Sequence, residues 1–151
     1  MSSNLWLVFV AGTVLCWGAY APSIHEGTKN LGNPWKTILC VGGAYFAIAV
    51  VVPLAILLVQ REGLQFTPRG TLFASIGGAL GALGAIGIVG ALRTGGTPLY
   101  VMPLVFGGAP IVNVLVSNAL HPPKNPPSPL LYVGFLVVAV GAGMVLYNKP
   151  Q

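Results

Sequence analysis

Apolar residues run through this chain in five long segments, and short polar connectors separate them. We predict helices at about residues 4–26, 37–59, 72–92, 98–120 and 130–147. A helix rises about 1.5 Å per residue, so about 20 apolar residues cross the roughly 30 Å hydrocarbon core of a bilayer. The pattern therefore predicts an all-α integral membrane protein, folded as a single bundle of five transmembrane helices.

Charged residues make up only 6% of the chain and fall almost entirely in the connectors. A charge at the bilayer centre costs roughly 2.5 to 3.5 kcal/mol on insertion scales, so these positions mark where the chain leaves the membrane. The net charge is +5, but the lysines and arginines are scattered and form no basic helix face. We therefore expect membrane lipids and no nucleic acid as partners, in a multi-pass protein of the bacterial inner (plasma) membrane.

The third segment is rich in glycine. Its glycines are Gly77, Gly78, Gly81, Gly84, Gly87 and Gly90. At about 100° per residue, Gly77, Gly81 and Gly84 share one stripe. Small residues let helix backbones approach closely in lipid. The stripe is thus either a packing surface or an interface that moves.

The fourth segment combines two prolines with polar side chains. Pro103 and Pro110 interrupt backbone hydrogen bonding, and broken helices with polar neighbours are typical of transport sites. We predict that one stripe of this helix binds substrate, through Met102, Phe106, Asn113 and Ser117. The alternative is that Asn113 and Ser117 bond a neighbouring helix.

The first segment carries two further groups of candidates. Trp17 and Tyr20 lie deep in the segment and either pack in the bundle or form an aromatic wall around an organic substrate. His25 and Glu26 follow Pro22 near the membrane boundary. This pair is a candidate for proton coupling, because histidine changes its charge near physiological pH. The alternative is that it caps the helix at the interface.

Familiar catalytic and metal-binding arrangements are absent from the sequence. It has two distant histidines, no paired carboxylates, no phosphate-binding loop and no Cys-x-x-Cys. We therefore predict that the protein is not an enzyme and holds no metal and no cofactor.

Several motifs occur in the order seen in a known family. They are the pair Trp17-Gly18, the glycine-rich third segment, the stretch TPLYVMPLVFGGAP that ends at Pro110, and a last segment with Gly134, Gly141 and Gly143. In this order the chain resembles one EamA-like half, a five-helix repeat, of the drug/metabolite transporter superfamily. The resemblance implies transport of small metabolites or drugs by alternating access between two inverted repeats.

This chain has one such repeat, so the resemblance implies a homodimer or a homologous five-helix partner. Related four-helix multidrug exporters use a glutamate within the first helix. Residues 5–21 here contain no acid, so that coupling mechanism is not expected.

The connector charges give little preference for either orientation in the membrane. Lysines and arginines on the side of the N-terminus are Arg61, Arg69 and Lys124, and those on the other side are Lys29, Lys36, Arg93 and Lys149. Orientation follows the excess of positive loop charge. The balance favours insertion both ways, and labelling of each terminus from one side of the membrane tests this.

The sequence therefore predicts half of a small-solute transporter that acts as a dimer on a neutral or weakly charged organic metabolite or drug. The alternative is an accessory or scaffolding subunit of a larger membrane complex that carries lipid or pigment. In that case His25 or His121 is a candidate axial ligand for a porphyrin-type metal. An intramembrane enzyme is a third hypothesis.

Overall fold

The computed structural model describes residues 5–123 and 128–148, and in these ranges the chain is helical with no strand. In chain order the elements are α1 (Leu5–Leu31), α2 (Pro34–Phe46), the π-helical segment η1 (Ala47–Val51), α3 (Val52–Gln60), α4 (Pro68–Arg93), α5 (Pro98–Leu120) and α6 (Pro129–Tyr147). Because α2, η1 and α3 form one span, the described residues contain five helices that are long and apolar enough to cross a membrane. The predicted set of five apolar helices is confirmed at this level.

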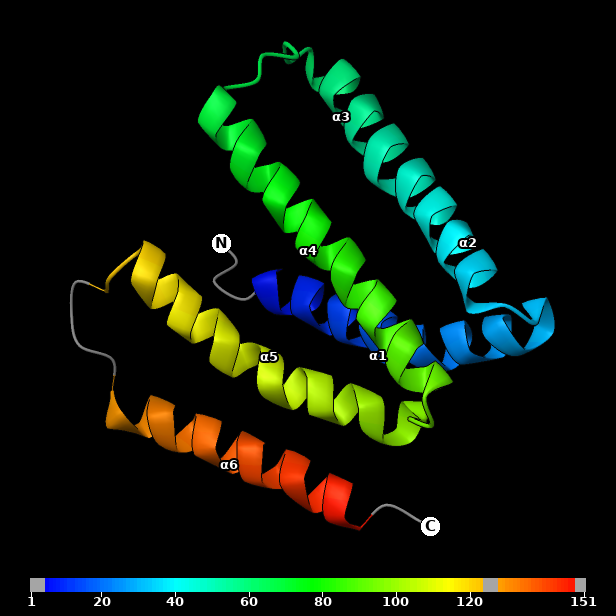
Figure 1. The fold of residues 1–151 in the computed structure, drawn as a ribbon. Helices are drawn as coiled ribbons and strands as arrows, with labels where there is room; N and C mark the ends of the chain where they lie inside the picture. Colours follow the sequence, from blue (N-terminus) through cyan, green and yellow to red (C-terminus); the bar gives the residue numbers. More distant parts are fainter. Residues whose placement is uncertain (1–4, 124–127, 149–151) are drawn as a thin grey trace. The chain divides into compact units, whose positions relative to one another are not determined.

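The second span contains a proline and still runs as one rod from Pro34 to Gln60 (Figure 1). Pro53 has no N–H to donate to the carbonyl of Ala49, and its ring would clash with that carbonyl in a regular α-helix. The wider π-helical turn η1 ends at Val51, two residues before Pro53. Its looser spacing accommodates the proline, so the span continues across its full length.

Four helices begin with a polar residue followed by proline, and in three of them the polar side chain caps the helix with a hydrogen bond. The Asn33 side chain accepts the Trp35 N–H at 2.9 Å, and Thr67 Oγ1 accepts the Gly70 N–H at 3.3 Å. Ser128 Oγ likewise accepts the Leu130 N–H at 3.3 Å. Each cap is followed by a proline at the first helical position, where the missing N–H costs nothing. This is why α2 and α4 begin before the predicted residues 37 and 72.

Helix α1 extends past Pro22 to Leu31, beyond the predicted end near residue 26. It ends at Gly32, whose φ of +64° lies in the left-handed region that glycine enters without strain. The Gly32 N–H donates to the Thr28 carbonyl at 3.0 Å, which closes the last turn. His25 and Glu26 therefore lie more than one turn before the end of the helix and not at its end.

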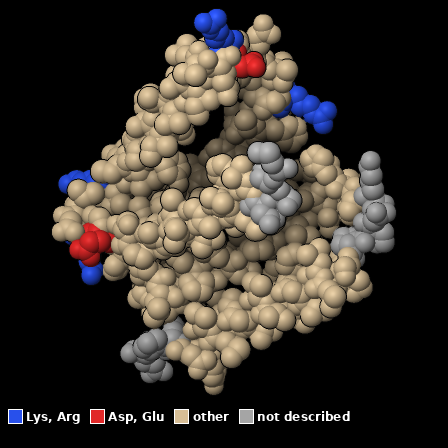
Figure 2. All heavy atoms as spheres, turned by 180° about the vertical axis from the view of Figure 1, so that it is seen from behind, with Lys and Arg blue, Asp and Glu red and all other residues tan. Residues whose placement is uncertain are grey.

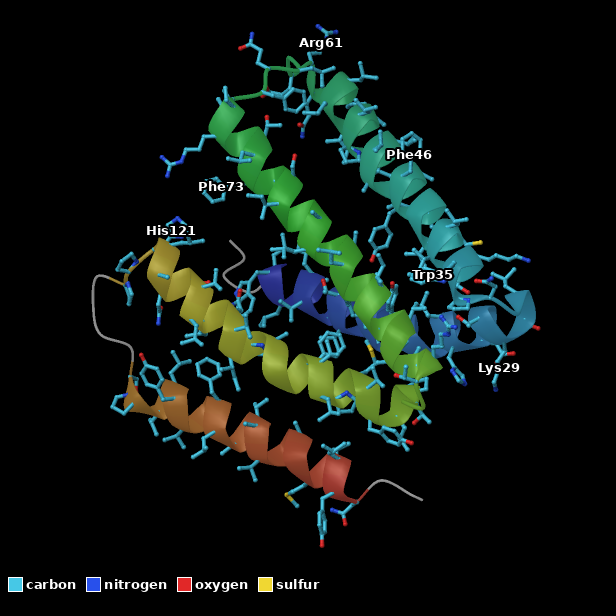
Figure 3. The ribbon with its side chains drawn as sticks, viewed as in Figure 1. Lys29, Trp35, Phe46, Arg61, Phe73 and His121 are labelled. Atoms are coloured by element: carbon cyan, nitrogen blue, oxygen red, sulfur yellow. The ribbon has the colours of Figure 1, made fainter. Side chains whose placement is uncertain are left out.

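The chain divides into two compact units, Met1–Thr94 and Gly95–Gln151, and each is described by itself. In the first unit α1, α2 and α4 contact one another; in the second, α5 and α6 form an antiparallel pair. Figure 3 shows Lys29 and Trp35 near one end of the second span and Arg61 at the other. On the face drawn in Figure 2 the charged side chains lie in small groups separated by wide uncharged surface, as expected for helices that meet lipid.

A hydrogen bond between two threonine side chains joins α1 to α2. Thr37 is buried, and its hydroxyl lies 3.0 Å from that of Thr28. The Thr28 hydroxyl donates to the Ile24 carbonyl at 2.8 Å. Because a hydroxyl carries one hydrogen, Thr37 is the donor to Thr28 in this arrangement, and its other acceptor, the Asn33 carbonyl, is farther away at 3.5 Å. The pair is close to Gly27, where an added Cβ would lie 3.7 Å from the Thr37 methyl group.

We expect Thr37→Val to destabilise the first unit by about 0.5 to 1.5 kcal/mol, since the variant keeps the shape and loses one interhelical hydrogen bond. Unfolding of the purified protein in mixed detergent measures the effect. Thr13→Val is the matched control, because the Thr13 hydroxyl bonds only the Phe9 carbonyl of its own helix at 2.9 Å. Equal losses in the two variants would show that the bond between α1 and α2 has no special role.

Candidate functional site

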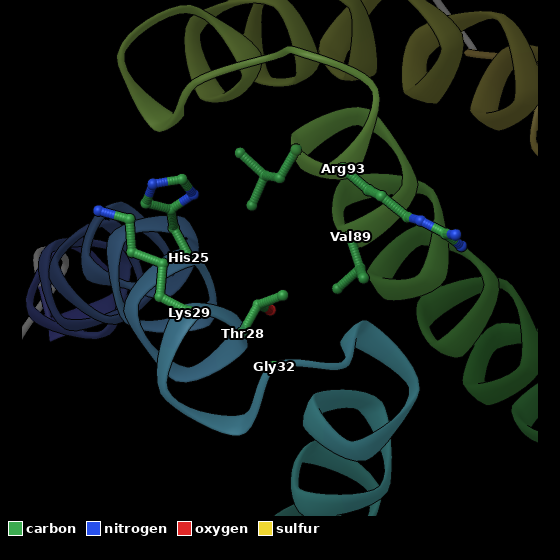
Figure 4. Close-up of a pocket in the computed structure, with 7 residues that line it drawn as sticks. His25, Thr28, Lys29, Gly32, Val89 and Arg93 are labelled. Atoms are coloured by element: carbon green, nitrogen blue, oxygen red, sulfur yellow. The ribbon is translucent and has the colours of Figure 1, made fainter.

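A cavity of about 250 Å³ lies in the first unit, at the carboxyl ends of α1 and α4 (Figure 4). The α1 side is formed by His25, Thr28, Lys29 and Gly32, and the α4 side by Val89, Leu92 and Arg93. The α1 residues are spaced by three and four, so they fall on one face of the helix. The end of each helix thus contributes one wall of the cavity.

The walls of this cavity carry basic groups and no acid. His25 and Lys29 lie together on the α1 side, and the Arg93 guanidinium on the α4 side points away from them (Figure 4). Glu26 is next to His25 in sequence but does not line the cavity. Its Oε1 accepts a hydrogen bond from Asn30 Nδ2 at 3.1 Å on the same helix. The cavity is therefore positively polarised.

His25 and Glu26, the predicted proton-coupling pair, have different surroundings. His25 is half-buried and lines the cavity, whereas Glu26 is exposed and bonded to Asn30. Nothing in these contacts links the imidazole to the carboxylate, so proton coupling by this pair stays a prediction. His121, the other candidate porphyrin ligand, is exposed at the end of α5. Within the described ranges no three side chains from His, Cys, Asp and Glu gather where they could hold a metal.

Trp17 and Tyr20 contact each other, with ring centroids 5.7 Å apart and planes tilted by 35°. Tilted pairs at this separation are a favourable aromatic arrangement. The Tyr20 hydroxyl is buried near Tyr45 of α2 and has no hydrogen-bond partner among the described residues. Trp17 remains 39% exposed. We call Trp17, Tyr20 and Tyr45 the aromatic cluster.

Sequence reasoning missed Tyr45, the third member of this cluster. A signal for it was present, since a tyrosine within an apolar segment needs a place for its hydroxyl. Both packing and substrate contact remain open to Trp17 and Tyr20, because the Tyr20 hydroxyl is buried whereas Trp17 is 39% exposed.

The predicted substrate-binding residues of α5 differ in exposure. Met102 is buried and Phe106 is 41% exposed, whereas Asn113 and Ser117 are both exposed. Neither polar side chain forms a hydrogen bond with any described residue. Both therefore retain donors and acceptors for a group outside this helix.

The side of α5 that faces α6 is marked by Gly107. A Cβ on Gly107 would lie 2.8 Å from the Cβ of Ala142, so the two backbones are in close approach there. At about 100° per residue the stripe through Met102, Asn113 and Ser117 is roughly a third of a turn away from Gly107. The stripe is therefore not the surface that packs on α6.

The six predicted substrate-binding residues are divided between the units: Trp17 and Tyr20 belong to the first, and Met102, Phe106, Asn113 and Ser117 to the second. Within each unit the residues share a helix and lie on one face. Comparison with protein-family models, with curated proteins and with solved structures found no match to this chain.

Proposed function

We propose that this chain is half of a small-solute transporter of the bacterial inner membrane and acts as a dimer by alternating access. The second half is a second copy of the chain or a homologous five-helix partner. The substrate is a neutral or weakly charged organic metabolite or drug, because the predicted substrate stripe carries amide, hydroxyl, aromatic and thioether groups and no fixed charge. In this proposal Trp17 and Tyr20 supply aromatic contacts, and Asn113 and Ser117 supply hydrogen bonds.

The observation that carries the proposal is that Asn113 and Ser117 are exposed in the second half of an apolar helix, with no hydrogen-bond partner among the described residues. A polar group left unsatisfied in hydrocarbon costs several kcal/mol. Such side chains are retained where they face water, a solute or another protein surface. Pro103 and Pro110 on the same helix each remove one backbone donor, which further favours a hydrated path beside α5.

The glycines of α4 support a dimer. Apart from Gly70 in its first turn, α4 has six glycines at which an added Cβ would meet no atom within 4 Å outside the local helix backbone: Gly77, Gly78, Gly81, Gly84, Gly87 and Gly90. Within the first unit there is thus room for a neighbouring helix beside these glycines, and Gly77, Gly81 and Gly84 form one smooth face. Small-residue faces of this kind allow close helix contact in lipid, and an odd number of spans makes an inverted second copy topologically natural.

Uptake into proteoliposomes tests the function. Purified protein is reconstituted and offered a panel of radiolabelled neutral, zwitterionic and singly charged organic solutes. We expect saturable flux for at least one neutral or weakly charged solute. The absence of flux for every solute, with folded protein in the vesicles, contradicts the proposal. Size measurement after gentle solubilisation distinguishes a transporter dimer from the alternative, an accessory subunit. A large stoichiometric complex with other proteins indicates an accessory subunit.

We expect Gly81→Leu to lower the dimer fraction by about tenfold. The bulky side chain would hold a second α4 helix away from this face, and the loss of close contacts would cost about 1 to 2 kcal/mol. Cross-linking in vesicles at several protein-to-lipid ratios measures the dimer fraction. Ala79→Leu is the control, because residue 79 lies on the opposite side of α4 from Gly77, Gly81 and Gly84. A dimer fraction that Gly81→Leu leaves unchanged shows that the glycine face is not the interface.

A further inference from the structure

The cavity at the ends of α1 and α4 takes no part in the proposed transport path, and its chemistry is different from that of the substrate stripe. Three nitrogen-bearing side chains line it, from His25, Lys29 and Arg93, and no carboxylate does. We propose that it is a binding site for the phosphate group of an anionic ligand, with His25, Lys29 and Arg93 as the groups that hold the phosphate oxygens.

The positions of Lys29 and Arg93 have a simpler explanation, but that explanation does not account for the cavity. Basic residues in the last turn of a helix interact favourably with its negative end, and both Lys29 and Arg93 occupy last turns. That effect places a charge on each helix separately. It does not require the two helix ends and His25 to converge on one hollow, which is what the structure shows (Figure 4).

The carbonyl oxygens at these helix ends would repel an anion, but two of them already accept hydrogen bonds from backbone N–H groups. The Thr28 carbonyl accepts the Gly32 N–H, and the Gly90 carbonyl accepts the Thr94 N–H, each at 3.0 Å. The Thr28 hydroxyl is also committed, since it donates to the Ile24 carbonyl and lies 3.0 Å from the Thr37 hydroxyl. The lysine, arginine and histidine side chains are therefore the groups left to face a ligand.

The nearest acid is held outside the cavity. Glu26 lies one residue from His25, yet its carboxylate is bonded to Asn30 on the neighbouring face of α1. The positive groups of the cavity thus repel one another with no acid among its walls. The Arg93 guanidinium points away from Lys29 in Figure 4, which is the arrangement that like charges prefer. An anion between them removes this repulsion, and the exposed Arg93 side chain is long enough to turn inward.

Size and position favour a lipid headgroup as the source of the phosphate. At about 250 Å³ the cavity is smaller than a typical site for a drug-sized molecule, which has roughly 300 to 1,000 Å³. It lies at one end of two membrane-length helices, and in a bilayer that these helices cross, such an end would lie near the lipid phosphates. Val89 and Leu92 provide apolar surface beside the basic groups, as an acyl chain requires. Basic pockets between transmembrane helices are known to bind anionic headgroups.

Lipid binding to the purified full-length chain tests the site. Phosphatidylglycerol, phosphatidylcholine and inorganic phosphate are titrated in separate arms, with native mass spectrometry for the lipids and thermal stability for all three. We expect phosphatidylglycerol to bind in preference to phosphatidylcholine. Lys29→Gln and Arg93→Gln should each weaken that binding by about fivefold, because a basic residue near an anionic headgroup contributes about 1 kcal/mol.

Lys36→Gln is the matched control, since Lys36 is exposed in the first turn of α2, just after the end of α1, and does not line the cavity. It should leave binding unchanged, and Lys29→Arg should retain binding because it keeps the charge. Stabilisation by inorganic phosphate that also depends on Lys29 and Arg93 would support the phosphate site and assign it a soluble source. Two results would overturn the proposal by showing only an effect of general surface charge. One is an equal loss of binding in Lys36→Gln and Lys29→Gln, and the other is no preference for phosphatidylglycerol or for inorganic phosphate.

Discussion

Gly107→Ala should weaken the pairing of α5 with α6, with an overpacking cost of about 1 to 3 kcal/mol that the better helix propensity of alanine offsets by up to about 1 kcal/mol. The new Cβ would lie 2.8 Å from the Cβ of Ala142, closer than real Cβ contacts occur, and 3.7 Å from the Val138 carbonyl oxygen. Neither neighbour is the end of a flexible side chain, so the helices must separate. Reversible unfolding in mixed detergent measures the change.

The adjacent glycine provides the control for this prediction. A Cβ on Gly108 meets nothing within 4 Å, so Gly108→Ala should be neutral or stabilising through helix propensity alone. The pair Gly107→Ala and Ala142→Gly should recover most of the lost stability, because the second change removes the contacted methyl group. If Gly107→Ala proves as stable as Gly108→Ala, the close approach of α5 and α6 at this point is wrong.

The number and type of helices could be predicted because burial in lipid leaves a direct trace in the sequence. Charges lie near the ends of the spans or between them, and the apolar segments have membrane length. Helix ends were harder, because they depend on local polar contacts that are weaker than the hydrophobic pattern. Thr67 and Pro68 start α4 with a side-chain cap at 3.3 Å, a signal that lies outside the apolar run.

The candidate site could be predicted only where side chains share one helix. The stripe on α5 follows from helical periodicity, and the Trp17–Tyr20 contact follows from a spacing of three. The basic cavity was not predicted, because it requires the ends of α1 and α4 to meet. The two ends meet because α1 continues through Pro22 to Leu31. The sequence pattern had predicted that this helix ends near residue 26.

Asn113→Ala should reduce kcat/KM for the transported solute by about tenfold, because an exposed amide on the substrate stripe contributes about 1 to 1.5 kcal/mol through a hydrogen bond. The expected change is mainly in KM, since the amide binds the solute in the ground state of the cycle. Asn113→Gln should recover part of the activity. Initial rates of uptake into proteoliposomes over a range of solute concentrations separate KM from kcat.

Asn118 is the matched control for Asn113, because it is the same residue type on the same helix and lies about a third of a turn away from the stripe. Asn118→Ala should leave KM unchanged. If the amide of Asn113 instead bonds a second copy, Asn113→Ala will lower the dimer fraction and reduce kcat and flux together, with KM unaffected. A pure KM effect therefore supports substrate contact, and equal effects at the two asparagines would contradict the assignment of the stripe as the substrate path.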